Sequence, residues 1–359
     1  MSAPMTSRQN AGWYRFRLGA FEGTVVWDGY IHHGYEGIYP NADPAEMARL
    51  QSAYLLPSDH IPMDLNPVVV NTGDKLWLID TGMGRTITWF GDRMGRFLEN
   101  LAAAGIDPAD IDGVLMTHLH PDHAYGLIHP DGTAAFPNAG LWCSDLDWAE
   151  WTDEENLKLS NSFRAPWTEG ALAAVAPYRD RVTIFRAGDQ ISEGISTFSV
   201  AGHAAGQIAY IFESEGQKMA FTGDVCHHQI YDPYHPEWFF HMDYDTNPQQ
   251  GADAKRAIFA KVVAEGIRYH GYHFPYPGIG TIRDHGDGTY RFLPEMVTPR
   301  LWGPGLWGPA SRPPITWQRR KSRCGCAWCI PGRQGLPPAG CDARRPPPRA
   351  RDRDRPPPR

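Results

Sequence analysis

Hydrophobic positions along the chain follow two spacings, and each spacing indicates one kind of secondary structure. Short apolar runs bounded by glycine, proline or aspartate are typical of strands. They predict a β-hairpin over residues 67–82 and single strands at residues 13–19, 24–27, 113–117, 182–185, 196–200, 208–212, 218–222 and 268–273. Apolar residues at helical spacing, or a capping residue before proline, predict helices at residues 42–52, 90–104, 153–176 and 252–266.

The predicted strands fall into two blocks, each mixed with helices, and the loops that follow them carry histidine or aspartate. Functional residues usually lie on loops that rigid strands hold in place. The order of elements therefore predicts a layered α/β sandwich with a site along one edge. The chain has 359 residues, of which 42% are hydrophobic, and this is enough for a large core. We expect residues 1–297 to form one domain.

Composition changes abruptly near residue 298. Residues 298–359 carry 14 lysines and arginines against 3 acidic residues, whereas the preceding part has a net charge of −18. Arginine and proline repeats replace the periodic pattern, so we interpret this segment as a disordered tail. A shifted reading frame in a GC-rich gene would explain its composition. The alternatives are a basic tail for anionic partners and a metal knuckle at Cys324, Cys326 and Cys329.

Composition also narrows the classes of protein to which the chain can belong. No run of about 18 uncharged apolar residues is present, so we expect no membrane-spanning helix. The N-terminus lacks a signal-peptide pattern, and we expect a cytoplasmic protein. The acidic body argues against a nucleic-acid partner, and its two cysteines, Cys143 and Cys226, argue against a disulfide scaffold. The sequence has neither a Gly-x-Ser-x-Gly motif nor a glycine-rich phosphate loop, which argues against serine hydrolases and NTPases.

The strongest chemical signal is a group of histidines and aspartates that follows the predicted strand 113–117. Its members are His118, His120, Asp122 and His123. Side chains two positions apart on an extended backbone point the same way, so His118 and His120 can face one point. Asp122 and His123 lie further along the loop and can face a second point. Because these side chains bind divalent metals, the spacing predicts a metal site.

Three more residues of the same chemistry follow later predicted strands. His203 lies in a glycine-flanked turn, Asp224 in a Thr-Gly-Asp turn, and His273 in a Gly-Tyr-His turn. Each alone has an ordinary explanation, as a loop side chain, a turn cap or a core histidine. Together with the first group, they predict one site built from both blocks of strands.

These motifs resemble those of the metallo-β-lactamase superfamily of αββα metallohydrolases. The resemblance spans about residues 66–280 and rests on the motifs at residues 78–82, 117–123, 202–203 and 222–224. It implies four layers, with two mixed β-sheets flanked by helices. The sequence around His273 is similar to the branch that contains methyl parathion hydrolase and related esterases and lactonases.

The resemblance also implies ligands for two metal ions. The first ion would be held by His118, His120 and His203. The second would be held by Asp122, His123 and His273, and Asp224 would bridge the two ions. Such donors suit Zn²⁺, with Mn²⁺, Co²⁺ and Fe²⁺ as alternatives. Two ions about 3.5–4 Å apart can hold a bridging hydroxide that is a nucleophile at neutral pH.

We therefore expect a zinc-dependent hydrolase in which this hydroxide attacks an ester-like bond of a lactone, an aryl ester or a phosphotriester. The alternatives on the same fold are a glyoxalase-II-like thioesterase and a phosphodiesterase. A β-lactamase is disfavoured, because Cys226 lies two residues after Asp224 and not at a ligand position. A metal-binding module without activity is also disfavoured, because every ligand position is intact.

Individual residues near the site have expected roles. Asp122 and Asp224 would serve catalysis as well as metal binding, and Asp80 would orient a ligand imidazole. His227 is a candidate hydrogen-bond or proton donor to the substrate. A surface position is the alternative for His227 and is preferred for His228. The remaining histidines are expected in loops or at the surface, and these are His32, His33, His60, His129, His235, His241, His270 and His285.

Aromatic residues in predicted loops suggest a small-molecule substrate with an apolar or aromatic part. The residues that would line its pocket are Trp89, Phe90, Trp148, Trp151 and residues 238–240. Core packing and a dimer face are the alternatives for these side chains. The resemblance favours a homodimer, because several members of the superfamily are dimers.

Overall fold

The computed structural model describes most of the acidic body of the chain. The described residues are 11–87, 93–159, 163–240 and 246–297. Every described residue lies within residues 1–310, the first of two units into which the chain divides. The Arg/Pro-rich tail predicted for residues 298–359 lies outside the described residues, so its boundary and its disorder stay predictions.

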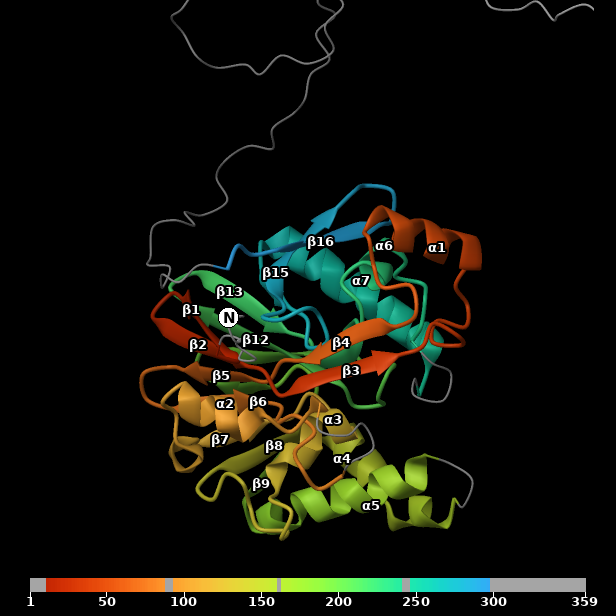
Figure 1. Ribbon diagram of the computed structural model, residues 1–359. Coiled ribbons are helices and arrows are strands. Elements are labelled where there is room, and N and C mark those ends of the chain that lie inside the picture. The colour runs from red at the N-terminus through yellow and green to blue at the C-terminus, as the bar shows by residue number, and fades with distance from the viewer. Residues whose placement is uncertain (1–10, 88–92, 160–162, 241–245, 298–359) are drawn as a thin grey trace, which may run out of the picture. The chain divides into compact units, whose positions relative to one another are not determined.

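Seven strands form a first mixed sheet (Figure 1). In spatial order they are β1 (Trp13–Leu18), β2 (Phe21–Val26), β5 (Val68–Asn71), β6 (Leu76–Ile79), β7 (Gly113–Leu115), β8 (Gly140–Ser144) and β9 (Val182–Phe185). Neighbours from β1 to β6 pair antiparallel, and neighbours from β6 to β9 pair parallel. Parallel neighbours need long connections, and these connections carry helices and the first group of predicted ligands.

Seven further strands form a second mixed sheet. In spatial order they are β10 (Gln190–Ser192), β11 (Ile195–Ser199), β12 (Ile208–Ser214), β13 (Gln217–Phe221), β14 (Arg268–His270), β15 (Ile279–Asp284) and β16 (Tyr290–Pro294). Only the β13–β14 pair is parallel among these described strands. A separate two-stranded sheet consists of β3 (Gly29–His33) and β4 (Ile61–Leu65).

The helices lie in the connections between strands. They are α1 (Pro44–Ala53), α2 (Phe97–Ala103), α3 (Pro121–Ala124), α4 (Asp145–Trp151), α5 (Arg164–Val175), α6 (Tyr231–Tyr234) and α7 (Pro248–Glu265). Short 3-10 helices are at Pro108–Asp110, Tyr125–Leu127, Glu154–Lys158, Ala176–Arg181 and Gly223–Val225. Among the described residues, no helix is long and apolar enough to cross a membrane.

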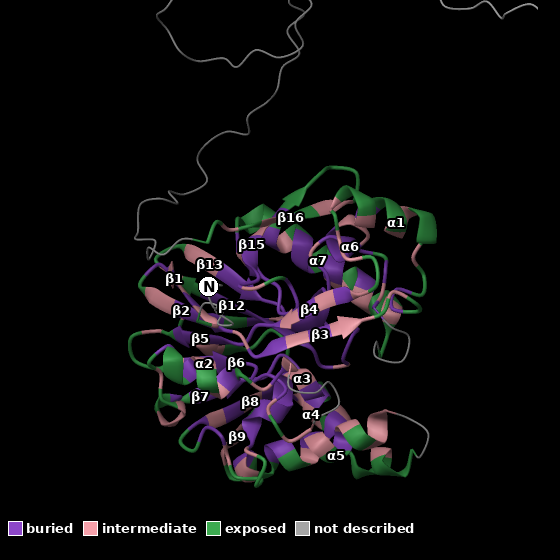
Figure 2. Cartoon of the chain, viewed as in Figure 1, coloured by how far each residue is buried: buried purple, intermediate pink, exposed green. Residues whose placement is uncertain are grey.

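Alternation along the strands explains why the two sheets pack face to face. In β5, Val68 and Val70 belong to the apolar cluster between the sheets, whereas Val69 belongs to the cluster beneath α2 and α5. In β12, Tyr210 faces the first sheet and Ile211 faces α7. Figure 2 shows the resulting buried layers, with exposed residues on the outer sides of the helices. The order helix, sheet, sheet, helix confirms the predicted αββα fold (Figure 1).

The helix predicted over residues 90–104 is shorter in the structure. It begins at Phe97 as α2, because Gly95 has a φ of 77°, outside the α-helical region. The N–H of Phe97 donates to Asp28 Oδ1 at 2.9 Å, so Asp28 satisfies the start of the helix. Residues 88–92 lie outside the described residues.

The predicted strand 268–273 is also shorter, and it is not the last one. It ends at His270, where the chain turns and the N–H of Gly271 donates to Gly278 O at 3.0 Å. The pattern did not predict β15 and β16, which follow this turn. Their outward positions carry charged residues such as Arg283 and Arg291, which hide the apolar alternation.

Candidate metal centre

The connection after β7 carries the first group of predicted ligands. After Leu115 the chain turns into the short helix α3, which begins at Pro121. Proline suits the first turn of a helix, because an N–H there has no partner within the helix. The predicted ligands on this connection are buried, except for the half-buried Asp122, and they are His118, His120, Asp122 and His123.

The remaining predicted ligands come from the second sheet. His203 lies between β11 and β12, Asp224 follows β13, and His273 follows β14. Gly202 has a φ of 147°, and a Cβ there would come within 2.2 Å of Gly251 Cα. Glycine thus allows the turn before His203 to approach the start of α7. Loops from both sheets meet at one edge, as the sequence predicts.

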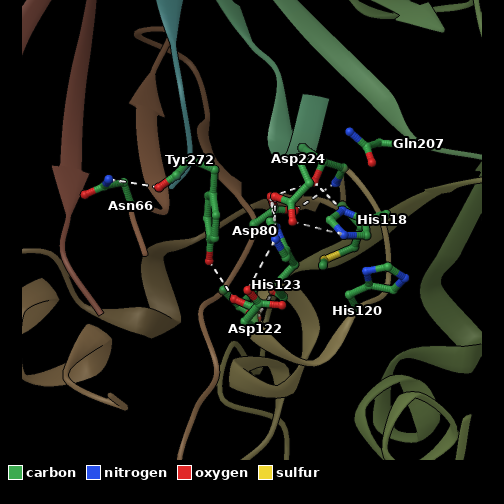
Figure 3. A network of polar contacts seen from close by, with 12 residues as sticks. Asn66, Asp80, His118, His120, Asp122, His123, Gln207, Asp224 and Tyr272 are labelled. Atoms are coloured by element: carbon green, nitrogen blue, oxygen red, sulfur yellow. Dashed lines mark hydrogen bonds and ion pairs between the residues drawn. The ribbon is translucent and has the colours of Figure 1, made fainter. Parts of the chain in front are cut away.

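Ligand-type atoms of these residues form two groups. Atoms within each group lie within 4.8 Å of one another, and the groups are His118, His120 and His203, and Asp122, His123, Asp224 and His273. Figure 3 shows His118, His120, Asp122, His123 and Asp224 turned toward one another. Asp224 Oδ2 is 3.1 Å from His273 Nε2 and 3.4 Å from His203 Nε2. Asp224 Oδ1 is 2.9 Å from His123 Nε2. The structure therefore brings all the predicted ligands together, with Asp224 between the two groups.

Partners outside the two groups hold the imidazoles in orientation. His123 Nδ1 donates to Asp80 Oδ2 at 2.8 Å, so its Nε2 faces the centre. His273 Nδ1 donates to Asp64 O at 3.0 Å, so its Nε2 faces Asp224. Such partners fix both the ring orientation and the tautomer of a metal ligand. The expectation that Asp80 contacts one of these imidazoles is confirmed.

Asp80 itself has an unusual backbone conformation. Its φ is 55°, a left-handed value that non-glycine residues adopt at a cost. Its buried carboxylate accepts the N–H of Thr117 at 2.8 Å and the hydroxyl of Thr117 at 2.7 Å. These contacts hold Asp80 in place between β6 and the histidine-bearing connection.

Replacing Asp80 by asparagine is expected to lower the affinity of these groups for a divalent metal ion by about 10- to 100-fold, the usual effect of losing such a partner. The amide keeps the size of the side chain but weakens the hydrogen bond that orients His123. Competition with a chromophoric chelator measures the affinity, and circular dichroism checks the fold. An affinity unchanged in a folded variant would contradict this role.

The charges of the centre are strongly coupled. Burial alone would raise the pKa of Asp224, but His123 and His273 hold it well below its ordinary value. Burial would lower the pKa of His123, but the nearby carboxylates, Asp224 first, raise it well above its ordinary value. Burial and neighbouring histidines lower the pKa of His118 well below its ordinary value. At neutral pH, His118 is therefore uncharged and has a lone pair to offer a cation.

Several buried polar atoms of the centre have no hydrogen-bond partner among the described residues, and they include His118 Nε2, His123 Nε2, Asp224 Oδ1 and His227 Nε2. His123 Nε2 and Asp224 Oδ1 lie 2.9 Å apart, a spacing that two ligands of one cation can have. An unsatisfied buried polar group costs about 1–3 kcal/mol of folding free energy, and a cation between these atoms would satisfy them. The donor set therefore fits divalent metal ions.

Sequence comparison identifies the family. The sequence profile of the metallo-beta-lactamase superfamily matches residues 62–257, more than half of the chain. The chain belongs to this superfamily. Its members generally bind divalent metals, usually zinc, which agrees with the His/Asp groups. No curated protein matches the chain in sequence.

Solved structures share the superfamily fold. A hydrolase called AbOPH, of the beta lactamase superfamily, has a TM-score of 0.75 and 29% identity, over 81% of this chain and 100% of its own. AidC, a dizinc quorum-quenching lactonase, has a TM-score of 0.73 and 23% identity, over 80% of this chain and 98% of its own. A probable metal-dependent hydrolase from Staphylococcus aureus has a TM-score of 0.65 and 22% identity, over 79% and 100%. The latter two likenesses show the fold alone.

Sequence analysis missed residues that hold the loops of this metallo-beta-lactamase fold together. Asn66 Nδ2 donates to the carbonyls of Tyr272 and Phe274 at 2.9 and 2.8 Å, on both sides of His273 (Figure 3). Tyr272 Oη donates to Asp122 O at 2.6 Å. Neither residue stands in a metal-ligand pattern, so no signal in the sequence pointed to them. Their partners lie about 150 to 210 positions away.

The buried Asp232 was also missed. Its Oδ2 accepts the backbone N–H groups of His227 and His228, each at 2.8 Å, and the hydroxyl of Tyr39 at 2.9 Å. Its Oδ1 lies 2.6 Å from the buried Lys255 Nζ. Asp232 therefore holds the segment that follows Asp224.

The structure corrects the expected position of His228. It is buried, with 3% of its surface exposed. Its Nδ1 accepts the N–H groups of Ile230 and Tyr231, so this polar atom has partners in the buried position. Burial lowers its pKa to about 4. His227 is buried too, and its Nε2 lies 3.3 Å from Asp224 Oδ2. The surface alternative is therefore wrong for both residues.

The expected aromatic residues have different positions. Phe239 and Phe240 line a pocket together with His203, Asp224 and His227. Trp151 packs against the ring of His120. Trp238 is buried in the core, and Trp148 is partly buried against it. Trp89, Phe90 and His241 lie outside the described residues.

His270 was expected in a loop or at the surface, but it is buried in β14. Burial lowers its pKa to about 3. In the unfolded chain the pKa of the His270 imidazole is higher, about 6.5. As the pH falls from 6.5 toward 3, the unfolded chain therefore binds a proton at His270 that the folded chain does not bind, and the folded state loses stability. The free energy of unfolding falls by about 1.4 kcal/mol per pH unit.

Replacing His270 by phenylalanine is therefore expected to flatten this acid dependence. Between pH 6.5 and 4.5, metal-free His270→Phe should lose roughly 2–3 kcal/mol less unfolding free energy than the parent chain. Urea unfolding at several pH values measures it. His285→Phe is the exposed control, and equal slopes in all three proteins would contradict the prediction.

Proposed function

We propose that this protein is a dinuclear metal-dependent hydrolase that cleaves an ester-like bond in a lactone, an aryl ester or a phosphotriester. The observation that carries the proposal is the convergence of two ligand groups on Asp224, each with its atoms within 4.8 Å. Two divalent ions, in the first instance Zn²⁺, would supply a nucleophile at neutral pH and polarise the bond under attack. Membership of a metallohydrolase superfamily supports this class of reaction.

Each group would hold one ion. The first ion would be held by His118, His120 and His203, and the second by Asp122, His123 and His273. Asp224 would contact both, because its carboxylate lies within 2.9 Å of His123 Nε2 in the second group and 3.4 Å of His203 Nε2 in the first. The low pKa of Asp224 keeps it ionised, which suits a bridging ligand.

His227 is the proposed donor to the leaving oxygen. It lines the pocket, and its ring stacks on Phe240 at 3.7 Å between centroids and 6° between planes. This stack fixes the direction of Nε2. Burial lowers the pKa of His227, so the ring is neutral near pH 7 and offers one N–H and one acceptor. A neutral imidazole can donate a hydrogen bond to the oxygen that leaves.

The pocket favours a substrate with an apolar part. Its lining includes Val200, Phe239 and Phe240 next to His203 and Asp224. Apolar side chains beside the reacting bond favour a substrate with an acyl or aryl part. Because AidC is a lactonase of the same fold, an acyl-homoserine lactone is the first substrate to test.

A hydrolysis panel tests the proposed function. Zn²⁺-loaded and chelator-stripped protein would be given an acyl-homoserine lactone, an aryl acetate, a phosphotriester, a thioester, a phosphodiester and a penicillin. Metal-dependent turnover of the lactone, the acetate or the phosphotriester is expected. Turnover confined to the other three substrates would assign the chain to another reaction of the superfamily and overturn the proposal.

Metal removal is expected to destabilise the fold. Ions that bind only the folded chain add about 2.7 kcal/mol at a concentration of 100 Kd. For a chain of this size, a chelator should therefore lower Tm by roughly 5–10 °C. Differential scanning calorimetry with and without chelator measures the shift, and re-addition of Zn²⁺ is the control. An unchanged Tm would contradict ion binding to the folded state.

A further inference from the structure

A third set of ligand-type atoms surrounds Asp224. His203, Asp224 and His227 place such atoms within 4.8 Å of one another, and all three residues are buried. Asp224 Oδ2 is 3.4 Å from His203 Nε2 and 3.3 Å from His227 Nε2. Two ligands at tetrahedral positions around Zn²⁺ lie about 3.3 Å apart, given Zn–N and Zn–O distances of about 2.0–2.1 Å. The spacing of this set therefore already suits an ion.

The environment of His227 supports the same conclusion. Its Nε2 is buried and has no hydrogen-bond partner among the described residues, like the Nε2 atoms of His118 and His123. The stack on Phe240 holds the ring in position. An imidazole nitrogen held 3.3 Å from a carboxylate oxygen, at the spacing of two ligands on one ion, is arranged as a metal ligand.

The position of this set differs from that of the proposed first metal site. His203, Asp224 and His227 all line the pocket, whereas His118 and His120 do not. An ion that arrives through the pocket thus meets His203, Asp224 and His227 before it meets the inner histidines. Two imidazoles and a carboxylate suit a divalent transition metal.

We propose that His203, Asp224 and His227 form a pocket-facing uptake position for a divalent transition metal. This inference rests on the proposed metal centre and adds a step to its assembly. His203 Nε2 can bind a single ion, so the uptake position and the site with His118 and His120 are alternatives for the same ion. Transfer exchanges His227 for the two inner histidines. Afterwards His227 Nε2 is available to the substrate.

Co²⁺ binding to the full chain tests the proposal without any need for turnover. His118→Asn/His120→Asn removes the inner ligands, and equilibrium dialysis with elemental analysis should still find two ions per chain. One ion would be at the uptake position and the other at the second group. Adding His227→Phe should leave one ion, because phenylalanine keeps the stack on Phe240 but offers no ligand. Equal stoichiometry with and without His227→Phe would overturn the proposal.

Uptake kinetics in the chain with intact inner ligands provide an independent test, should the inner variant fail to fold. Metal-free His227→Phe should take up Co²⁺ more slowly than the parent chain, because the pocket-facing ligand set has lost one of its three members. His228→Asn is the matched control, since it is the neighbouring buried histidine and keeps an acceptor for its backbone contacts. An unchanged uptake rate in His227→Phe would also overturn the proposal. The hydrolysis panel on the parent chain tests the proposed function separately.

Discussion

Asp224→Asn is expected to lower kcat/KM for the preferred ester substrate by about a thousandfold. The carboxylate of Asp224 reaches both proposed ligand groups, because Oδ1 lies 2.9 Å from His123 Nε2 and Oδ2 lies 3.4 Å from His203 Nε2. An amide offers one neutral oxygen, so it cannot bridge two ions as a carboxylate does. The electrostatic contribution of a metal centre is several kcal/mol, and about 4 kcal/mol corresponds to this loss in rate.

Metal content and activity should change together in this variant. Elemental analysis is expected to find fewer than two ions per chain in Asp224→Asn, with the helix and sheet content unchanged by circular dichroism. Asp253→Asn, an exposed aspartate on α7, is the matched control. Activity of Asp224→Asn within a few-fold of the parent chain would show that Asp224 does not bridge the ions.

Lys255→Met is expected to lower the free energy of unfolding by about 3–5 kcal/mol, the usual cost of removing one partner from a buried ion pair. Lys255 Nζ lies 2.6 Å from Asp232 Oδ1 and donates to Trp238 O at 2.5 Å. Burial would raise the pKa of Asp232, but Lys255 holds it below its ordinary value. Without Lys255, the carboxylate stays buried without a cation.

Urea unfolding with linear extrapolation measures this loss. Lys261→Met is the matched control on the same helix, because Lys261 pairs with Glu265 in a more exposed position and should cost at most about 1 kcal/mol. Lys255→Met/Asp232→Asn should recover much of the stability, since neither charge is then left alone. Equal effects of Lys255→Met and Lys261→Met would contradict the prediction.

The Lys255–Asp232 pair also links stability to the metal centre. Asp232 accepts the backbone N–H groups of His227 and His228, three and four residues after Asp224. At the other end of this segment, Gln207 accepts the N–H groups of Asp224 and Val225 at 3.1 and 3.0 Å when its amide oxygen faces them. The segment that carries Asp224 and His227 is therefore held at both ends by buried side chains.

Periodicity predicted most strands of the two large sheets but placed several boundaries wrongly. The buried strands β7 and β12 have continuous apolar runs, which makes them easy to find. β15 and β16 were missed, because outward positions such as Arg283 and Arg291 break the apolar pattern. The start of α2 depended on the positive φ of Gly95, which apolar spacing does not reveal.

The candidate ligands could be proposed from the sequence because metal chemistry restricts residue types strongly. His118, His120, Asp122 and His123 lie within one short connection, so their spacing is visible in the sequence. His203 and His273 carry no such local pattern, and the family resemblance was needed to connect them with the first group. The structure then brought their ring nitrogens toward Asp224.

By itself the sequence determined the layered fold, the superfamily and the residues able to bind metals, since these depend on local periodicity and on residue chemistry. Only the tertiary structure decided which partners orient those residues. Asn66 and Asp232 act through contacts with residues distant in sequence, and the same is true of the stack of His227 on Phe240. Burial, orientation and pKa depend on neighbours that folding brings together, and a linear pattern contains no record of those distances.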